Sequence, residues 1–134
     1  MKWIIYFISS IQIDNIGRKW LASDWLGVFP LDKIPFIEEN KALIVNTQSS
    51  NLGGEHWIAV YNKPEHVLVF DPFGFYYPSF LVSKLSMLSK PIEYNRTQYQ
   101  QWFTTTCGQH CLLWLKYQYE LCNKKNFSIK TIVI

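Results

Sequence analysis

The chain of 134 residues has only three cysteines, which is too few, and an odd number, for a disulfide framework. We therefore expect free thiols in a reducing, intracellular compartment. The chain also lacks any run of about 18 apolar residues, so we predict no membrane-spanning helix and no membrane partner. A short apolar stretch at residues 3–8 is followed by no small-residue cleavage site, and secretion is therefore not expected.

Charged residues are also scarce, at 17% of the chain, and the formal net charge is +3. So mild a charge permits contact with DNA but argues against a dedicated nucleic-acid-binding module. Apolar residues make up 49% of the chain and aromatic residues 17%, which is enough for a densely packed core. Since no linker, repeat or low-complexity tract divides the chain, we predict a single domain over residues 1–134.

Short strand-like runs and two helical stripes follow one another along the chain. The predicted strands cover residues 42–47, 56–61, 66–70 and 91–94. The predicted helices cover residues 78–88 and 107–121. Residues 2–12 fit a buried helix or a strand equally well, and residues 27–35, with two prolines and a glycine, read as an irregular connection.

Two polar residues flank the predicted hairpin of residues 56–61 and 66–70. His56 opens its first strand and Asp71 follows its second. Because antiparallel partners run back alongside each other, these two side chains are expected to lie close together. Asp71 also begins a sequence typical of a type I turn, with proline second and glycine fourth.

Cys107 lies at the predicted start of the last helix. Free backbone N–H groups and the positive end of the helix dipole favour a thiolate there. Gly108 leaves room for a substrate backbone to approach. The competing interpretations are structural: a buried cysteine that packs as a small hydrophobe, a histidine that merely ends a strand, and an aspartate that merely starts a turn.

A thiol, an imidazole and a carboxyl group are the groups that a cysteine peptidase requires, together with a donor for the oxyanion. In this interpretation Cys107 is the nucleophile, His56 the general base and Asp71 the group that orients the base. A glutamine side chain before Cys107 could serve as the oxyanion donor, and the candidates are Gln98, Gln100 and Gln101. The Cys107, His110 and Cys111 spacing lacks a second ligand pair, so we predict no metal site.

Four segments resemble the adenovirus-type endopeptidases of adenoviruses and related virus-like mobile elements. They are Val45-Asn46-Thr47, Gly53-Gly54-Glu55-His56-Trp57, Phe70-Asp71-Pro72-Phe73-Gly74-Phe75 and Thr106-Cys107-Gly108. The resemblance implies an α+β fold, in which a central, mainly antiparallel sheet packs on a core helix that carries the nucleophile at its N-terminus. It also implies a catalytic set of His56, Asp71, Gln101 and Cys107, and only this resemblance selects Gln101 among the glutamines.

The same resemblance implies cleavage of viral or mobile-element precursor proteins during particle maturation, in the nucleus or cytoplasm of a host cell and in the particle. Adenovirus enzymes carry Glu at the position of Asp71, and they use a disulfide-linked peptide and DNA as activators. This chain has no cysteine shortly before Gln101 to receive such a peptide. The sequence therefore indicates no required cofactor, although the resemblance allows a peptide or DNA activator.

Two alternatives remain open at the level of the sequence. SUMO-deconjugating peptidases share the order His, Asp, Gln and Cys, so the chain could remove ubiquitin-like modifiers. A catalytically inactive binding module of the same fold is the other alternative.

Overall fold

The computed structural model describes residues 9–47, 56–74, 77–95 and 107–124, with side chains as far as residue 121 in the last segment. It contains three α-helices, α1 (Ser10–Leu21), α2 (Ser79–Ser86) and α3 (Cys107–Lys124). Two short 3-10 helices are η2 (Ala22–Asp24) and η3 (Leu31–Lys33). The strands are β1 (Trp25–Pro30), β2 (Lys41–Asn46), β3 (Trp57–Asn62), β4 (Val67–Phe70) and β5 (Ile92–Tyr94).

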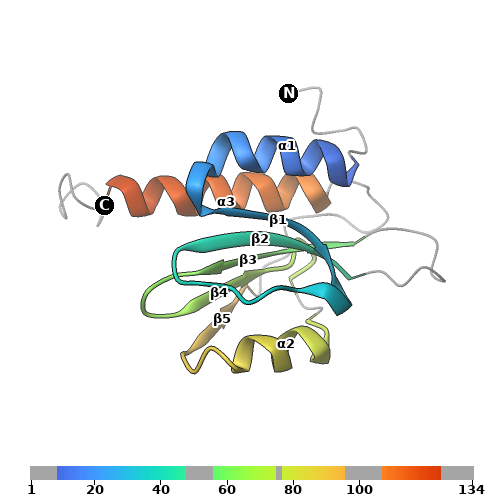
Figure 1. Cartoon of the computed structure of the whole chain (residues 1–134), viewed down its shortest axis with the longest axis vertical. Helices are drawn as coiled ribbons and strands as arrows, with labels where there is room; N and C mark the ends of the chain where they lie inside the picture. The colour runs from blue at the N-terminus through green and yellow to red at the C-terminus, as the bar shows by residue number, and fades with distance from the viewer. Residues whose placement is uncertain (1–8, 48–55, 75–76, 96–106, 125–134) are drawn as a thin grey trace.

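The five strands form one sheet whose spatial order is the order of the chain, from β1 to β5. The two inner pairings are antiparallel, whereas β1 joins β2, and β5 joins β4, in parallel. Helices α1 and α3 cover one face of this sheet and α2 the other (Figure 1). The predicted α+β fold with a core helix beginning at Cys107 is confirmed, and the sheet is mixed because both of its edge strands are parallel to their neighbours.

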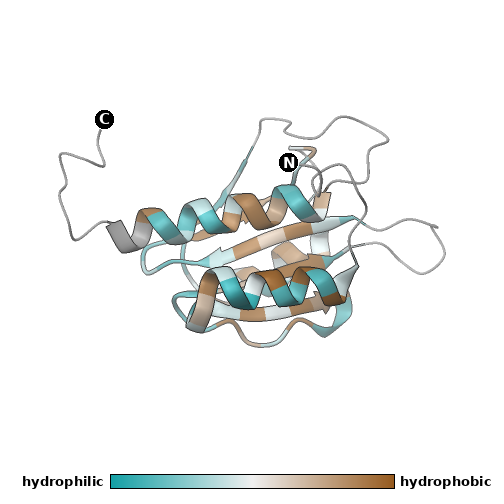
Figure 2. Ribbon diagram, turned by 90° about the horizontal axis from the view of Figure 1, so that it is seen from above, coloured by the Kyte–Doolittle hydropathy of each residue, from teal (hydrophilic) through white to brown (hydrophobic). Residues whose placement is uncertain are grey.

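Each face of the sheet has its own hydrophobic core. On the α1 and α3 side, inward residues of the sheet pack against the helix stripe, including Ile44, Ala59, Tyr61, Leu112 and Leu115. On the α2 side the core includes Leu43, Val45, Val60, Leu81 and Leu85. Strand β3 is buried along its whole length, so alternate residues enter both cores. Figure 2 shows α1 and α3 lying over the sheet, with hydrophobic and hydrophilic residues interspersed along both helices.

Helix α1 begins with a capping box that the sequence interpretation overlooked. The Ser9 hydroxyl accepts from the Gln12 backbone N–H, and the Gln12 side chain accepts from the Ser9 N–H. Reciprocal bonds of this kind satisfy donors that a helix start leaves unpaired. A serine followed three residues later by a glutamine is the sequence signal of this cap. Residues 10–12, which belong to the stretch left open above, are helical.

Strand β1 corrects the prediction of an irregular connection over residues 27–35. Residues 27–30 instead continue a strand from Trp25, η3 follows directly, and the chain is irregular only from residue 34. Pro30 is tolerated because β1 is an edge strand and Pro30 is its last residue. Gly27 has φ 142° beside a register shift in the β1–β2 pairing, a bulge geometry that glycine adopts without strain.

The other predicted elements are confirmed within one to three residues at their ends. The strand at 42–47 is β2, the hairpin is β3 and β4, the strand at 91–94 is β5, and the two predicted helices are α2 and α3. The hydrogen bond from the Gly74 N–H to the Asp71 carbonyl, at 2.8 Å, closes the predicted turn. Among the described residues, no helix has the length and apolar content needed to cross a membrane.

Gly17 provides a test of how α1 packs on β1. A Cβ atom at this position would lie 2.4 Å from the Trp25 ring, whose indole nitrogen donates to Asp14 at 2.8 Å. We expect Gly17→Ala to lower the free energy of unfolding by about 1–3 kcal/mol, because overpacking outweighs the better helix propensity of alanine. Urea denaturation measures this change. The control Asn15→Ala, on the exposed side of α1, should be within about 0.5 kcal/mol of the parent, and equal stability of the two variants would contradict the packing.

Candidate active site

His56 and Asp71 meet at one end of the β3–β4 hairpin, as the sequence predicts. His56 immediately precedes β3 and Asp71 immediately follows β4. The His56 Nε2 and Asp71 Oδ1 atoms are 2.7 Å apart. Asp71 is fully buried and His56 is only 8% exposed, so water screens this hydrogen bond weakly.

The contact fixes the role of each ring nitrogen in neutral His56. An ionised carboxylate only accepts hydrogen bonds, so Nε2 carries the proton that it donates to Asp71. Nδ1 then carries the lone pair and is the atom that can accept a proton. The geometry therefore gives His56 a tautomer that is set by a buried carboxylate and suits the role predicted for it.

Phe73 also supports this pair, and the sequence interpretation gave it no role. Its backbone N–H donates to Asp71 Oδ1 at 3.1 Å, the same oxygen that accepts from His56. Its ring stacks on the imidazole, with centroids 4.8 Å apart and planes inclined by 18°. The β3–β4 pairing ends at Ala59 and Phe70, and Phe73 lies in the turn beyond it, so no strand pattern in the sequence predicted this role.

Cys107 is the first residue of α3, and that end of the helix is attached to the start of β3. One turn further on, the Cys111 thiol donates to the Trp57 carbonyl at 3.3 Å. The Trp57 backbone also forms a hydrogen bond to the Cys107 sulfur, and the charge of Asp71 acts on that sulfur. Cys107 thus lies beside the residue that follows His56, and the structure gathers the predicted nucleophile, base and carboxylate in one region.

The ionisation state of Cys107 differs from the prediction. Burial raises the pKa of the Cys107 thiol to about 11, and the Asp71 charge raises it further. Hydrogen bonds from the backbone of Trp57, Gly108 and Cys107 itself lower the pKa, in the direction expected for a helix start, but burial is the larger effect. Only 4% of the residue is exposed, so burial disfavours the thiolate that the helix start was expected to favour.

Cys111 and His110, which are close to Cys107 in the sequence, lie in fully and partly buried surroundings. Cys111 is fully buried in the core, and burial raises the pKa of its thiol. Half-buried His110 has its pKa lowered by burial. No group of three potential metal ligands occurs among the described residues. Gln101 and its rivals Gln98 and Gln100 lie outside the described residues, as does the segment 53–55.

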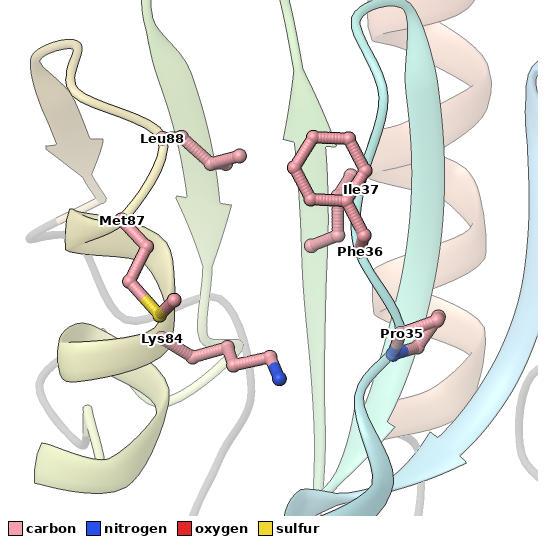
Figure 3. Close-up of a pocket in the computed structure, with 6 residues that line it drawn as sticks. All are labelled: Pro35, Phe36, Ile37, Lys84, Met87 and Leu88. Carbon is pink, nitrogen blue, oxygen red and sulfur yellow. The ribbon is translucent and has the colours of Figure 1, made fainter.

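A small apolar pocket lies on the opposite side of the sheet, between α2 and the segment that precedes β2 (Figure 3). Its volume is about 190 Å³, and its lining consists of Pro35, Phe36, Ile37, Lys84, Met87 and Leu88. None of the predicted catalytic residues lines it, so it is not the reaction centre.

Comparison with known proteins adds sequence and fold relatives. The family model described as adenovirus endoprotease matches residues 25–133. A protease of bovine adenovirus C serotype 10 is 30% identical over 94 residues, which cover 58% of this chain and 48% of that protein. The chain thus spans about half the length of this relative.

Two crystal structures of an ASFV protease share the fold. Their TM-scores are 0.58 and 0.53, at 13% and 11% identity. Each alignment covers 84% of this chain, and 58% and 57% respectively of the ASFV chains. At this level of identity the likeness concerns the fold alone.

The raised pKa of Cys107 predicts a distinctive reactivity. A thiol with a pKa of about 11 is about one ten-thousandth thiolate at pH 7, so alkylation by iodoacetamide should be slow there and rise about tenfold per pH unit up to pH 10. Peptide mass spectrometry measures the alkylation rates of Cys107 and Cys111 separately at a series of pH values. A rate already constant above pH 7 would show a preformed thiolate instead.

Proposed function

The chain belongs to the adenovirus endoprotease family, and from that premise we propose that it is a cysteine endopeptidase that cleaves viral or mobile-element precursor proteins during particle maturation. The observation that carries the proposal is the buried 2.7 Å contact between His56 and Asp71, beside a thiol at the start of a helix. A histidine or an aspartate with only a structural role would not need to lie beside the other and beside a thiol. Membership of the family gives the combination its chemical interpretation.

In the proposed reaction the Cys107 sulfur attacks the carbonyl carbon of the scissile peptide bond. Because the resting group is a thiol, His56 Nδ1 removes its proton as the carbon–sulfur bond forms. Asp71 stabilises the resulting imidazolium through Nε2 and remains ionised. The backbone N–H of Cys107 and the side chain of Gln101 are the proposed donors to the oxyanion.

Collapse of the tetrahedral intermediate breaks the carbon–nitrogen bond. His56 returns its proton to the leaving amine, which departs and leaves a thioester on Cys107. Water then attacks the thioester carbonyl while His56 again accepts a proton. The second collapse releases the carboxylic acid product and restores the thiol, so no redox partner or metal takes part in this scheme.

The proposed partners are structural precursor proteins, and the proposed sites of action are the host nucleus or cytoplasm and the particle itself. Titration of the purified chain with a peptide or with DNA, while precursor cleavage is measured, tests whether an activator is required. Ubiquitin-like vinyl sulfone probes test the deconjugase alternative, because labelling of Cys107 by such a probe, without cleavage of precursors, would favour it.

Cys107→Ala and His56→Ala should each reduce processing of co-expressed precursor proteins by at least about a thousandfold, because each removes a group that forms or breaks a bond. Processing is measured by mass spectrometry of precursor and product. His66→Ala serves as the matched control, because His66 lies at the far end of the hairpin beside Glu93. This variant should process the precursor at the parent rate. Normal processing by folded Cys107→Ala would refute the peptidase proposal.

Asp71→Asn tests the orienting role separately. The amide has nearly the shape of the carboxylate, but it cannot supply negative charge to an imidazolium. We expect kcat to fall by about 10²–10⁴-fold with little change in KM, since the loss concerns the transition state. Steady-state kinetics on a cleaved precursor peptide measures both constants. An unchanged kcat would exclude Asp71 from the catalytic set.

A further inference from the structure

We propose that Asn95 is a positioning residue for Asp71: its side-chain amide holds the Asp71 backbone in place, and the Tyr77 hydroxyl holds Asn95. This inference deepens the proposed function and rests on it. Neither residue touches the thiol or the imidazole directly in the bonds described below. Their action on the reaction therefore passes through the carboxylate.

The amide of Asn95 bonds to both backbone groups of Asp71. Asn95 Oδ1 accepts from the Asp71 N–H at 2.7 Å, and Asn95 Nδ2 donates to the Asp71 carbonyl at 2.6 Å. Two bonds to one residue restrict both its translation and its rotation. With its backbone fixed in this way, Asp71 can aim Oδ1 at His56 with little freedom.

These bonds replace the main-chain ladder at the point where it ends. The parallel pairing of β4 and β5 runs as far as Val69 opposite Tyr94, and the Asn95 N–H still reaches the Val69 carbonyl at 3.3 Å. In a regular ladder the Asp71 N–H would next bond to the main-chain carbonyl of Asn95. The side-chain carbonyl of Asn95 accepts that bond instead, so the amide acts as a substitute peptide group.

Tyr77 takes the main-chain acceptor that this substitution leaves available. Its hydroxyl oxygen lies 2.5 Å from the Asn95 carbonyl oxygen and 2.7 Å from Asn95 Oδ1. A hydroxyl has one proton, which it can donate to either oxygen. The Tyr77 ring also contacts the Tyr94 ring at 4.5 Å between centroids, so the hydroxyl is carried by a packed side chain.

The arrangement explains why a three-residue edge strand is sufficient beside a catalytic carboxylate. Strand β5 has only three residues and is only partly buried, so it forms few backbone hydrogen bonds with β4. Asp71 follows the last residue of β4 and lies outside that ladder. The amide and hydroxyl restore, through side chains, the restraint that a longer strand would have provided through its backbone.

The test compares Asn95→Ala and Tyr77→Phe with a matched control, Asn62→Ala. Asn62 is also an amide with one donated and one accepted side-chain bond, to Ile37 and from Lys90, but it lies at the other end of the hairpin. Its replacement therefore reproduces the loss of two hydrogen bonds without disturbing Asp71. Tyr77→Phe removes only a hydroxyl and keeps the packed ring, which retains a folded variant if Asn95→Ala does not fold.

Two readouts are required. Kinetics on a cleaved precursor peptide should show kcat reduced about tenfold or more in Asn95→Ala, a smaller reduction in Tyr77→Phe, and KM within about threefold of the parent in both. Proton NMR of the full chain with ¹⁵N-labelled histidine should show a shift of the His56 Nε2–H signal. This shift should be larger in Asn95→Ala than in Tyr77→Phe. Asn62→Ala should change neither readout, whatever its effect on stability.

The two readouts separate failure of this inference from failure of the proposed function. If the chain cleaves no precursor, the proposed function fails, yet a shifted His56 signal in Asn95→Ala still supports the positioning role. A His56 signal identical to that of the parent in folded Asn95→Ala or in Tyr77→Phe would overturn the inference. So would an Asn62→Ala variant that moves the signal as far as Asn95→Ala does.

Discussion

The hydrogen bonding of one buried carboxylate is the constraint on which this structure depends. Asp71 has no exposed surface, and a charge in such a place is costly unless donors surround it. Two donors are His56, at the end of the β3–β4 hairpin, and the backbone N–H of Phe73, in the turn that follows β4. The Phe73 ring stacks on the imidazole that bonds to this carboxylate, and the Asn95 amide bonds to the Asp71 backbone.

The two layers of the domain contribute different parts of the chemistry. The sheet supplies the imidazole and the carboxylate of the proposed site, whereas α3 supplies the sulfur by packing its first turn against the start of β3. That packing has a chemical cost, because the same burial that holds Cys107 in position raises the pKa of its thiol. Position and ionisation therefore compete at this residue, and the proposed mechanism resolves the competition by removing the proton during attack rather than beforehand.

The hairpin could be predicted from sequence because two short, continuous apolar runs flank a polar turn, and their antiparallel pairing brings His56 near Asp71. Strand β1 could not, because Gly27 and Pro30 suit a loop as well as an edge strand and only pairing with β2 decides. The start of α1 was readable from Ser9 and Gln12 and was overlooked. The ionisation of Cys107 depends on how tightly tertiary packing excludes water, and no local pattern reports that. The role of Gln101 remains a prediction, since it lies outside the described residues.

The agreement between strand order and chain order has a consequence for how the domain assembles. Every neighbouring pair in the sheet is also consecutive in sequence, so each pairing closes a comparatively short loop and loses little chain entropy. The β3–β4 hairpin closes the shortest of these loops, and it is the unit that joins imidazole to carboxylate. The sulfur arrives from a distant helix and meets them only when that helix docks. On these grounds we expect the hairpin to form before α3 docks, so that the proposed catalytic set is complete only in the fully folded domain.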